Sequence, residues 1–259
     1  MAHLSQAQID AFIENGFVVV RNLLDSERIT KCLDLFKEKT GLVFDDANTW
    51  PEGVTDWHPV RDEGFEWDHD LAIAPEIQEI VHELAGPHVH LPRFSPVLRL
   101  PQSGPKVHEL MGVHIDARFR GITPYPSQFY LLVFGYLTDV DHPYDAPFSA
   151  YSGSPRKVFE YSQQPGVDLG EEYKPRDASL PDLDYGDPIG VTGKAGDVIF
   201  AHFLMVHSAS LNRGDHVRVG LRGEAKSPGY EFVPKTGEPQ DEWTPLDWTL
   251  RTDNLVLES

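Results

Sequence analysis

The sequence predicts a mainly β fold, of the sandwich or jelly-roll kind, buttressed by helices near its N-terminus. Three amphipathic segments with helix-capping residues lie within about the first 87 residues. From about residue 88, prolines and glycines recur between short apolar runs, which is typical of many short strands. With 259 residues and 40% apolar content, the chain can bury a sizeable core. We therefore expect one domain over residues 1–259, with a helical buttress over about 1–87, a jelly-roll core over about 88–225 and a C-terminal extension.

The three predicted helices each carry a start signal and a stop signal. Ser5 is placed to cap an amphipathic helix that stops at Gly16. Residues 25–41 repeat this pattern of cap, apolar stripe and terminal glycine. A third, short helix is expected over 74–86, where aliphatic residues recur at helical spacing. Between the first two helices, the β-branched run at 17–20 predicts a strand.

The later part of the chain is expected to supply most of the strands. The strand-like runs are "SPVLRL", "SQFYLLVFGYLTDV", "DVIFAHFLMVHS" and "VRVGLRGEA". Residues 162–188 are polar and rich in proline and aspartate, which predicts a long surface excursion. Loops of that length are often functional lids.

Charge and cysteine content limit what the protein binds. A formal net charge of −19 argues against nucleic acid or an anionic membrane as a main partner. The single cysteine, Cys32, excludes an intrachain disulfide and fits a reducing compartment. The N-terminus lacks a signal-peptide pattern, and no apolar run is long enough for a membrane-spanning helix. We therefore expect a soluble cytoplasmic protein whose partner is a small-molecule substrate, with no nucleic acid and no membrane; the sequence does not indicate an oligomeric state.

The stretch "GVHIDARF" places a histidine and an aspartate two residues apart. On an extended strand, His114 and Asp116 leave the same face, where an imidazole and a carboxylate can bind one metal. With 12 histidines and 41 acidic residues, such a pair also arises by chance. An isolated His-x-Asp is more often a hydrogen-bonded surface pair, so this motif needs support from elsewhere in the chain.

Residues 196–218 contain three further candidate ligands, His202, His207 and His216. His202 and His207 are five residues apart, so on one unbroken strand their side chains would point to opposite sides. Only one of the two is then expected to face a barrel interior. Each histidine by itself could equally be a structural residue with its ring N–H hydrogen-bonded.

Two arginines in the last strand-like run form the third candidate feature. Arg218 and Arg222 are four residues apart and therefore share a strand face. A guanidinium in an apolar β core is costly unless it meets an anion. That anion is either one of the chain's own carboxylates or the carboxylate of a small substrate, which a planar guanidinium can grip with two hydrogen bonds.

Together these features fit a site in which two histidines and one carboxylate occupy one face of a non-haem iron. Such a site leaves positions open for a cosubstrate and O2, and a nearby arginine can anchor the far carboxylate of a bound 2-oxoacid. The combination is more specific than any one of its parts.

The chain also resembles a known family, the phytanoyl-CoA dioxygenases, which are Fe(II)- and 2-oxoglutarate-dependent oxygenases. The likeness covers most of the chain and is carried by "AFIENGFVVVRNLLDSERI", "LPQSGPKVHELMGVHID", "FGYLTDVDHPYDAPFSAYSGSPRKV" and "GDVIFAHFLMVHSASLNRGDHVRVGL". The resemblance implies a double-stranded β-helix, which is a cupin-like jelly roll, and it implies Fe(II), 2-oxoglutarate and O2 as cofactor and cosubstrates.

The resemblance also assigns roles to five residues. It implies that His114, Asp116 and His207 bind the metal and form the catalytic centre. It implies that Arg218, eleven residues after His207, grips 2-oxoglutarate, and that Tyr136 lies near this cosubstrate. Asp116 favours hydroxylation, because family members that halogenate lack this carboxylate. The implied reaction oxidises a small-molecule metabolite and releases succinate and CO2.

The chain departs from the family pattern in two places. Ala209 stands where the family often has a serine that helps to hold the cosubstrate, and "SGSPRKV" replaces the usual Gly-Ser-His. Two alternatives stay open: a cupin-like metal enzyme that does not use 2-oxoglutarate, and a non-catalytic jelly-roll binding module. Substrate-binding residues are not assigned. Arg118 and Arg120 could face an anionic group or solvent, and the Trp- and His-rich stretch 50–69 could cover the site or pack at the surface.

Overall fold

The computed structural model describes residues 4–44, 46–51, 54–62, 64, 66–116, 130–162, 164–167 and 180–226. The expected C-terminal extension beyond residue 226, residues 168–179 of the expected surface excursion, and both Arg118 and Arg120 lie outside the described residues.

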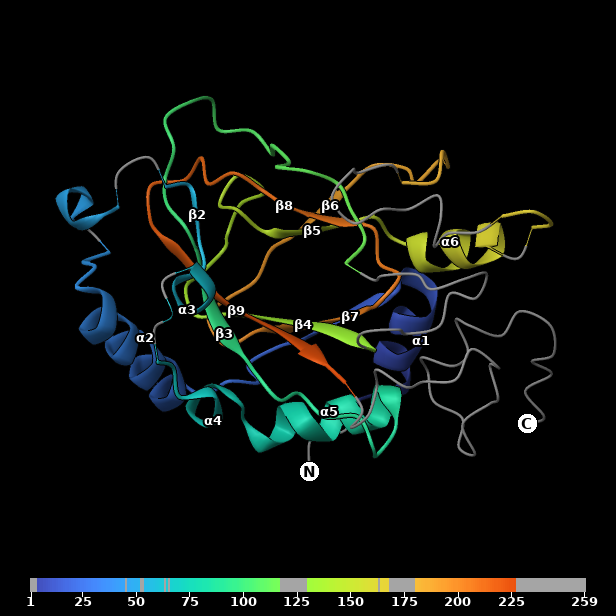
Figure 1. Ribbon diagram of the computed structural model, residues 1–259, viewed down its shortest axis with the longest axis horizontal. Helices are drawn as coiled ribbons and strands as arrows, with labels where there is room; N and C mark the ends of the chain where they lie inside the picture. The colour runs from blue at the N-terminus through green and yellow to red at the C-terminus, as the bar shows by residue number, and fades with distance from the viewer. Residues whose placement is uncertain are drawn as a thin grey trace.

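Two antiparallel sheets face each other in the arrangement of a jelly roll, as the sequence predicts (Figure 1). The larger sheet has the strand order β1-β7-β4-β9-β3-β2, and the smaller sheet has the order β6-β5-β8. The strands are β1 (Phe17–Val20), β2 (Asp56–Trp57), β3 (Ser95–Arg99), β4 (Leu131–Tyr136), β5 (Phe148–Ala150), β6 (Ile189–Val191), β7 (Val198–His202), β8 (His207–Ala209) and β9 (Arg218–Ala225).

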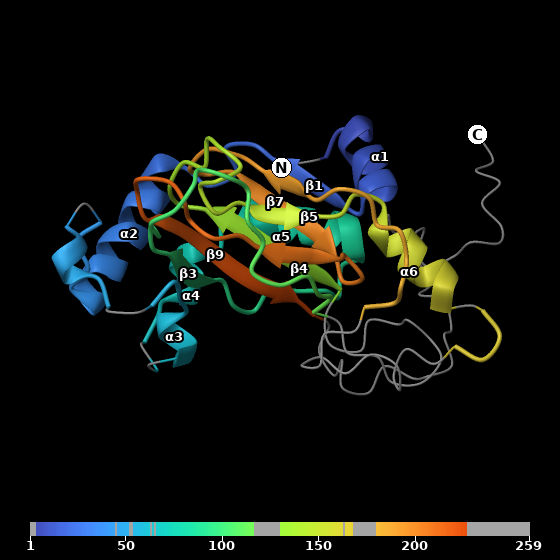
Figure 2. The same cartoon turned by 90° about the horizontal axis from the view of Figure 1, so that it is seen from above.

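The helices are mostly N-terminal. They are α1 (Gln6–Asn15), α2 (Ser26–Thr40), the 3-10 turn η1 (Ala47–Thr49), α3 (Pro59–Asp62), α4 (His69–Ala72), α5 (Pro75–Ala85) and α6 (Ser154–Ser162). Helix α5 lies along the outer side of the larger sheet, opposite the smaller sheet (Figures 1 and 2). Among the helices that the structure describes, none combines the length and apolar character needed to cross a bilayer.

The three helices predicted from caps and periodicity are α1, α2 and α5. In α1, the Ser5 hydroxyl accepts from the Gln8 N–H, and the Gln8 side chain accepts from the Ser5 N–H, forming a capping box. Gly16 ends this helix with a φ of 80°. A Cβ there would lie 2.4 Å from Cγ of Pro155, so the glycine also lets α6 pack closely against α1.

The run "DVIFAHFLMVHS" does not form the single strand that we expected. Strand β7 ends at His202, and β8 begins in the other sheet at His207. A turn breaks the run, because the Leu204 N–H donates to Nδ1 of His202 and the Met205 N–H donates to its carbonyl, at 3.0 and 2.9 Å. The chain therefore crosses from the larger sheet to the smaller between these two histidines, and it does so next to the candidate site.

Candidate metal centre

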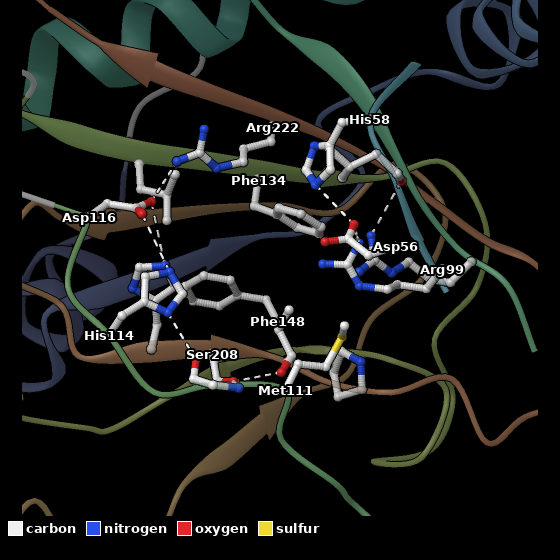
Figure 3. Close-up of a pocket in the computed structure, with 17 residues that line it drawn as sticks. Asp56, His58, Arg99, Met111, His114, Asp116, Phe134, Phe148, Ser208 and Arg222 are labelled. Carbon is white, nitrogen blue, oxygen red and sulfur yellow. Dashed lines mark hydrogen bonds and ion pairs between the residues drawn. The ribbon is translucent and has the colours of Figure 1, made fainter. Parts of the chain in front are cut away.

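A cavity of about 500 Å³ opens between the two sheets and carries polar side chains at two ends (Figure 3). One end, here called the metal end, holds the side chains of His114, Asp116 and His207. The other, here called the arginine end, holds Arg99, Arg218, Asp56 and His58. The wall between the two ends is mostly apolar, and its side chains include Val97, Leu132, Phe134, Pro147 and Phe148.

The two histidines of the metal end lie opposite each other on neighbouring antiparallel segments. His207 begins β8, and His114 pairs with it through two backbone hydrogen bonds of 2.9 Å each. Directly opposed positions bring side chains on one face close together, and the two ring centroids are 4.4 Å apart. Two histidines that are far apart in the sequence are thus brought together by backbone pairing.

Each ligand histidine has its ring orientation fixed by its own chain segment. Nδ1 of His114 lies 2.9 Å from the carbonyl of Gly112, and Nδ1 of His207 lies 2.9 Å from the carbonyl of Met205. A carbonyl oxygen only accepts, so each Nδ1 carries the proton and each Nε2 keeps a lone pair. This is the tautomer that a metal-binding histidine needs.

Asp116 completes a group of three ligands. His114 Nε2 lies 3.4 Å from Asp116 Oδ1, and His207 Nε2 lies 3.6 Å from Asp116 Oδ2. One ligand atom from each residue lies within 4.8 Å of the others. Two imidazole nitrogens and one carboxylate are the donor set of non-haem Fe(II) sites, so the residues present fit such a metal.

The charges at the metal end favour a cation. Burial alone raises the pKa of Asp116, but the adjacent His114 and His207 rings and the charge of Arg222 outweigh it and hold this pKa well below its ordinary range. Burial lowers the pKa of His114, but the Asp116 carboxylate outweighs it, so the pKa rises overall. Asp116 is therefore an anion, as a ligand to a divalent cation must be.

The other two histidines of the closing segment lie away from this group. His202 is buried in the core against Phe203, and burial lowers its pKa to about 3. His216 is exposed, with Nε2 2.9 Å from the carbonyl of Asp139. Of the three candidates, only His207 reaches the metal end.

Arg218 is a deeply buried cation at the arginine end, with 2% of its surface exposed. Its Nε donates to the carbonyl of Ala146 at 2.9 Å, and its guanidinium lies 5.1 Å from the ring centroid of Phe134. Gly220 makes room for both groups, because a Cβ there would lie 2.8 Å from Phe134 and 2.9 Å from Nη1 of Arg218. Burial, and then the charge of Arg99, lowers the pKa of Arg218 to about 9. Among the described residues, no carboxylate lies within ion-pair distance of Arg218, so this cation calls for an external anion.

The sequence does not assign a site role to three residues of the arginine end: Asp56, His58 and Arg99. The strand register places Asp56, Arg99 and Arg218 in one row across β2, β3 and β9. Arg99 donates to Asp56, and Nε2 of His58 lies 2.9 Å from Oδ1 of the same carboxylate. The Asp56 carboxylate therefore pairs with Arg99 and His58, and Arg218 lies beside Arg99 in the row without an ion-pair partner among the described residues. A signal for Arg99 did exist, because it is the one charged residue in the strand-like run "SPVLRL".

The second arginine of β9 has a different partner. Arg222 faces the same cavity, but its Nη2 donates to Oδ2 of Asp116 at 2.5 Å and to Oε1 of Glu224 at 3.1 Å. The two arginines of β9 therefore differ in their partners. Arg222 pairs with carboxylates of the chain itself, whereas Arg218 pairs with none of the described carboxylates.

Tyr136 is fully buried between the two sheets and is held by two hydrogen bonds. Its hydroxyl donates to the carbonyl of Val191 at 2.6 Å and accepts from the Phe148 N–H at 3.0 Å. Burial raises the pKa of Tyr136 to about 12. Tyr136 is not one of the described residues that line the cavity. It supports the wall by holding the backbone of Phe148, and direct contact with a cosubstrate stays a prediction.

The fold and the site together define a class of protein: a jelly roll with a His-Asp-His metal site facing a buried arginine across one cavity. Residues 12–220 match the phytanoyl-CoA dioxygenase family. Since this match spans most of the chain, the protein belongs to that family, as the sequence motifs predict.

Solved structures share the fold at low sequence identity. The epimerase SnoN, in complex with Fe3+, alpha ketoglutarate and nogalamycin RO, is 20% identical with a TM-score of 0.58, over 93% of this chain and 94% of its own. The non-heme alpha ketoglutarate dependent carbocyclase SnoK from nogalamycin biosynthesis is 21% identical with a TM-score of 0.57, over 93% and 95%. EvdMO1 is 23% identical with a TM-score of 0.55 over 86% of this chain, which spans 50% of the EvdMO1 chain. A comparison with curated proteins gives no match.

Proposed function

We propose that the protein is an Fe(II)- and 2-oxoglutarate-dependent oxygenase that hydroxylates a small-molecule metabolite. The observation that carries this proposal is the pairing of the two ends of one cavity. The metal end offers three ligand atoms within 4.8 Å of one another, and the arginine end offers a buried cation without a described carboxylate partner. 2-Oxoglutarate has a chemical group for each end: a 2-oxoacid for the metal and a second carboxylate for Arg218.

The chain's own residues hold and orient the reactants. Bound Fe(II) supplies the oxidising chemistry, in which O2 and 2-oxoglutarate become succinate and CO2 while the substrate gains one oxygen atom. His114, Asp116 and His207 hold the metal, and Arg218 pairs with the distal carboxylate and fixes its direction. Phe134 and Phe148 line the apolar wall, which keeps water away from the reacting groups.

The substrate is expected to be small or amphipathic. A cavity of about 500 Å³ has to hold the cosubstrate as well, and its lining combines apolar side chains with charged and polar ones. The net charge of −19 favours a metabolite over a polyanion. SnoN and SnoK are named an epimerase and a carbocyclase, so the kind of product has to be measured. Hydroxylation adds an oxygen atom, epimerisation leaves the mass unchanged, and ring closure removes two hydrogens.

The test is coupled turnover. Protein loaded with Fe(II) is given 2-oxoglutarate, O2 and a panel of amphipathic metabolites, and succinate and product masses are measured. We expect succinate release to rise with a true substrate and to match the product, which carries one added oxygen. The same protein loaded with Zn(II) is the matched control and should release no succinate. Product without consumption of 2-oxoglutarate would indicate a different cupin-like metal enzyme, and a chain that binds no iron would be a binding module.

A further inference from the structure

The two histidine ligands and the carboxylate ligand are oriented in different ways. Each histidine has its Nδ1 fixed by a carbonyl two residues earlier. Asp116 has no such local partner among the described residues, and its contacts come from the two histidines and from Arg222. A ligating carboxylate usually needs an outer hydrogen bond to fix its direction.

We propose that Arg222 is the positioning residue of the metal end, holding the Asp116 carboxylate so that one oxygen is presented to the metal. The proposal rests on the metal site of the proposed function. Arg222 would act on the metal through its contact with Asp116, since a guanidinium is not itself a metal ligand.

The contacts make the two oxygens of Asp116 unequal. Oδ2 accepts a charge-assisted hydrogen bond of 2.5 Å from Nη2 of Arg222. Oδ1 faces His114 Nε2 at 3.4 Å and has no cation on it among the described residues. The guanidinium thus engages Oδ2 and leaves Oδ1 free of Arg222 on the His114 side, so the carboxylate is oriented before a metal binds.

Arg222 is itself held by charges along β9. Oε1 of Glu224 lies 3.1 Å from its Nη2, and Oε2 of Glu224 lies 3.1 Å from Nζ of Lys226. These residues alternate along one strand, so their side chains share a face. A row of alternating charge, Lys226, Glu224, Arg222 and Asp116, therefore ends at the metal site. Arg218, on the same face of β9, lies outside this row and has no ion-pair partner among the described residues.

The test compares two identical substitutions on one strand. Arg222→Gln and Arg218→Gln each remove one guanidinium from the same face of β9. Each variant is titrated with Co²⁺ in the absence of 2-oxoglutarate and O2, and visible absorption reports both affinity and coordination. We expect Arg222→Gln to weaken Co²⁺ binding about 10- to 100-fold and to change the Co²⁺ spectrum, as loss of an outer-shell partner does. Arg218→Gln should leave Co²⁺ affinity within about twofold of the wild type, because its guanidinium does not touch a ligand.

Three outcomes would overturn the proposal. Wild-type affinity and spectrum in Arg222→Gln would remove Arg222 from the site but leave the proposed function intact. Equal weakening in both variants would show a general disturbance of β9 and no role specific to Arg222, because loss of positive charge by itself favours a bound cation. Failure of the wild-type protein to bind Co²⁺ at all would overturn the proposed function together with this inference. If Arg222→Gln does not fold, Arg222→Lys takes its place, since an ammonium keeps the charge but not the planar fork. Its Co²⁺ affinity should then fall at least about threefold, and wild-type affinity would contradict the proposal.

Discussion

The two ends of the cavity are built by different means. At the metal end, the histidine rings are fixed locally, each by a carbonyl two residues before it in the chain. At the arginine end, the key side chains meet because β2, β3 and β9 pair in a register that places Asp56, Arg99 and Arg218 in one row. Backbone pairing brings the two histidines of the metal end together, but their ring orientation depends on short-range contacts, whereas the arginine end depends on sheet register alone.

The charges at the two ends differ as well. At the metal end, the carboxylates of Asp116 and Glu224 share Arg222. At the arginine end, Asp56 pairs with Arg99, and Arg218 lies outside ion-pair distance of the described carboxylates. One end therefore has negative charge to offer a metal, and the other has positive charge to offer an anion. A ligand that joins the two ends must bind a metal through one group and carry a carboxylate at the other.

Removing a ligand from the metal end should have the largest effect. His207→Ala and Asp116→Ala are each expected to lower metal affinity by more than about 100-fold, beyond the range of outer-shell changes, because each takes away a donor atom. Titration with Co²⁺ and measurement of succinate release check this. His202→Asn is the matched control, since His202 lies in the core and the asparagine oxygen can accept the Leu204 N–H in place of Nδ1. Loss of metal binding in the His202 variant alone would reverse the assignment of the two histidines.

Substitutions at the arginine end should weaken the binding of 2-oxoglutarate and leave metal affinity unchanged. Arg218→Gln is expected to raise the 2-oxoglutarate concentration for half-maximal turnover about 100-fold, because a buried charge pair is lost. Arg99→Gln should raise it about tenfold, because the Asp56 carboxylate, released from Arg99, would compete for Arg218. Steady-state succinate release at varied 2-oxoglutarate measures both. If Arg99→Gln had the larger effect, Arg99 and not Arg218 would be the main anchor.

The two ends also differ in how far the sequence predicts them. The His-x-Asp spacing places two ligands on one strand face, and the family resemblance supplies His207 and Arg218. On one unbroken strand His202 and His207 would point to opposite sides, but the chain turns at residues 203–206 and places the two histidines in different sheets. The pairing of strands that are far apart in the sequence cannot be predicted from a local sequence pattern. For that reason Asp56 was missed, although its partner Arg99 stands out as a charge in an apolar run.

The smallest expected effect is on the pH dependence of stability and concerns His202, which belongs to neither end of the cavity. Its behaviour distinguishes a core histidine from a metal ligand. Burial lowers its pKa from 6.5 to about 3 in the folded protein. Below about pH 6.5 the unfolded chain therefore takes up a proton that the folded chain does not, so stability falls as the pH falls toward 3. Between pH 7 and pH 5, this one group should cost the wild type about 2 kcal/mol of unfolding free energy. His202→Asn does not titrate, so urea unfolding of the metal-free proteins at several pH values should show the wild type losing stability faster than the variant. Parallel pH dependences would mean that His202 accepts its proton without leaving the core, and that burial alone does not set its charge.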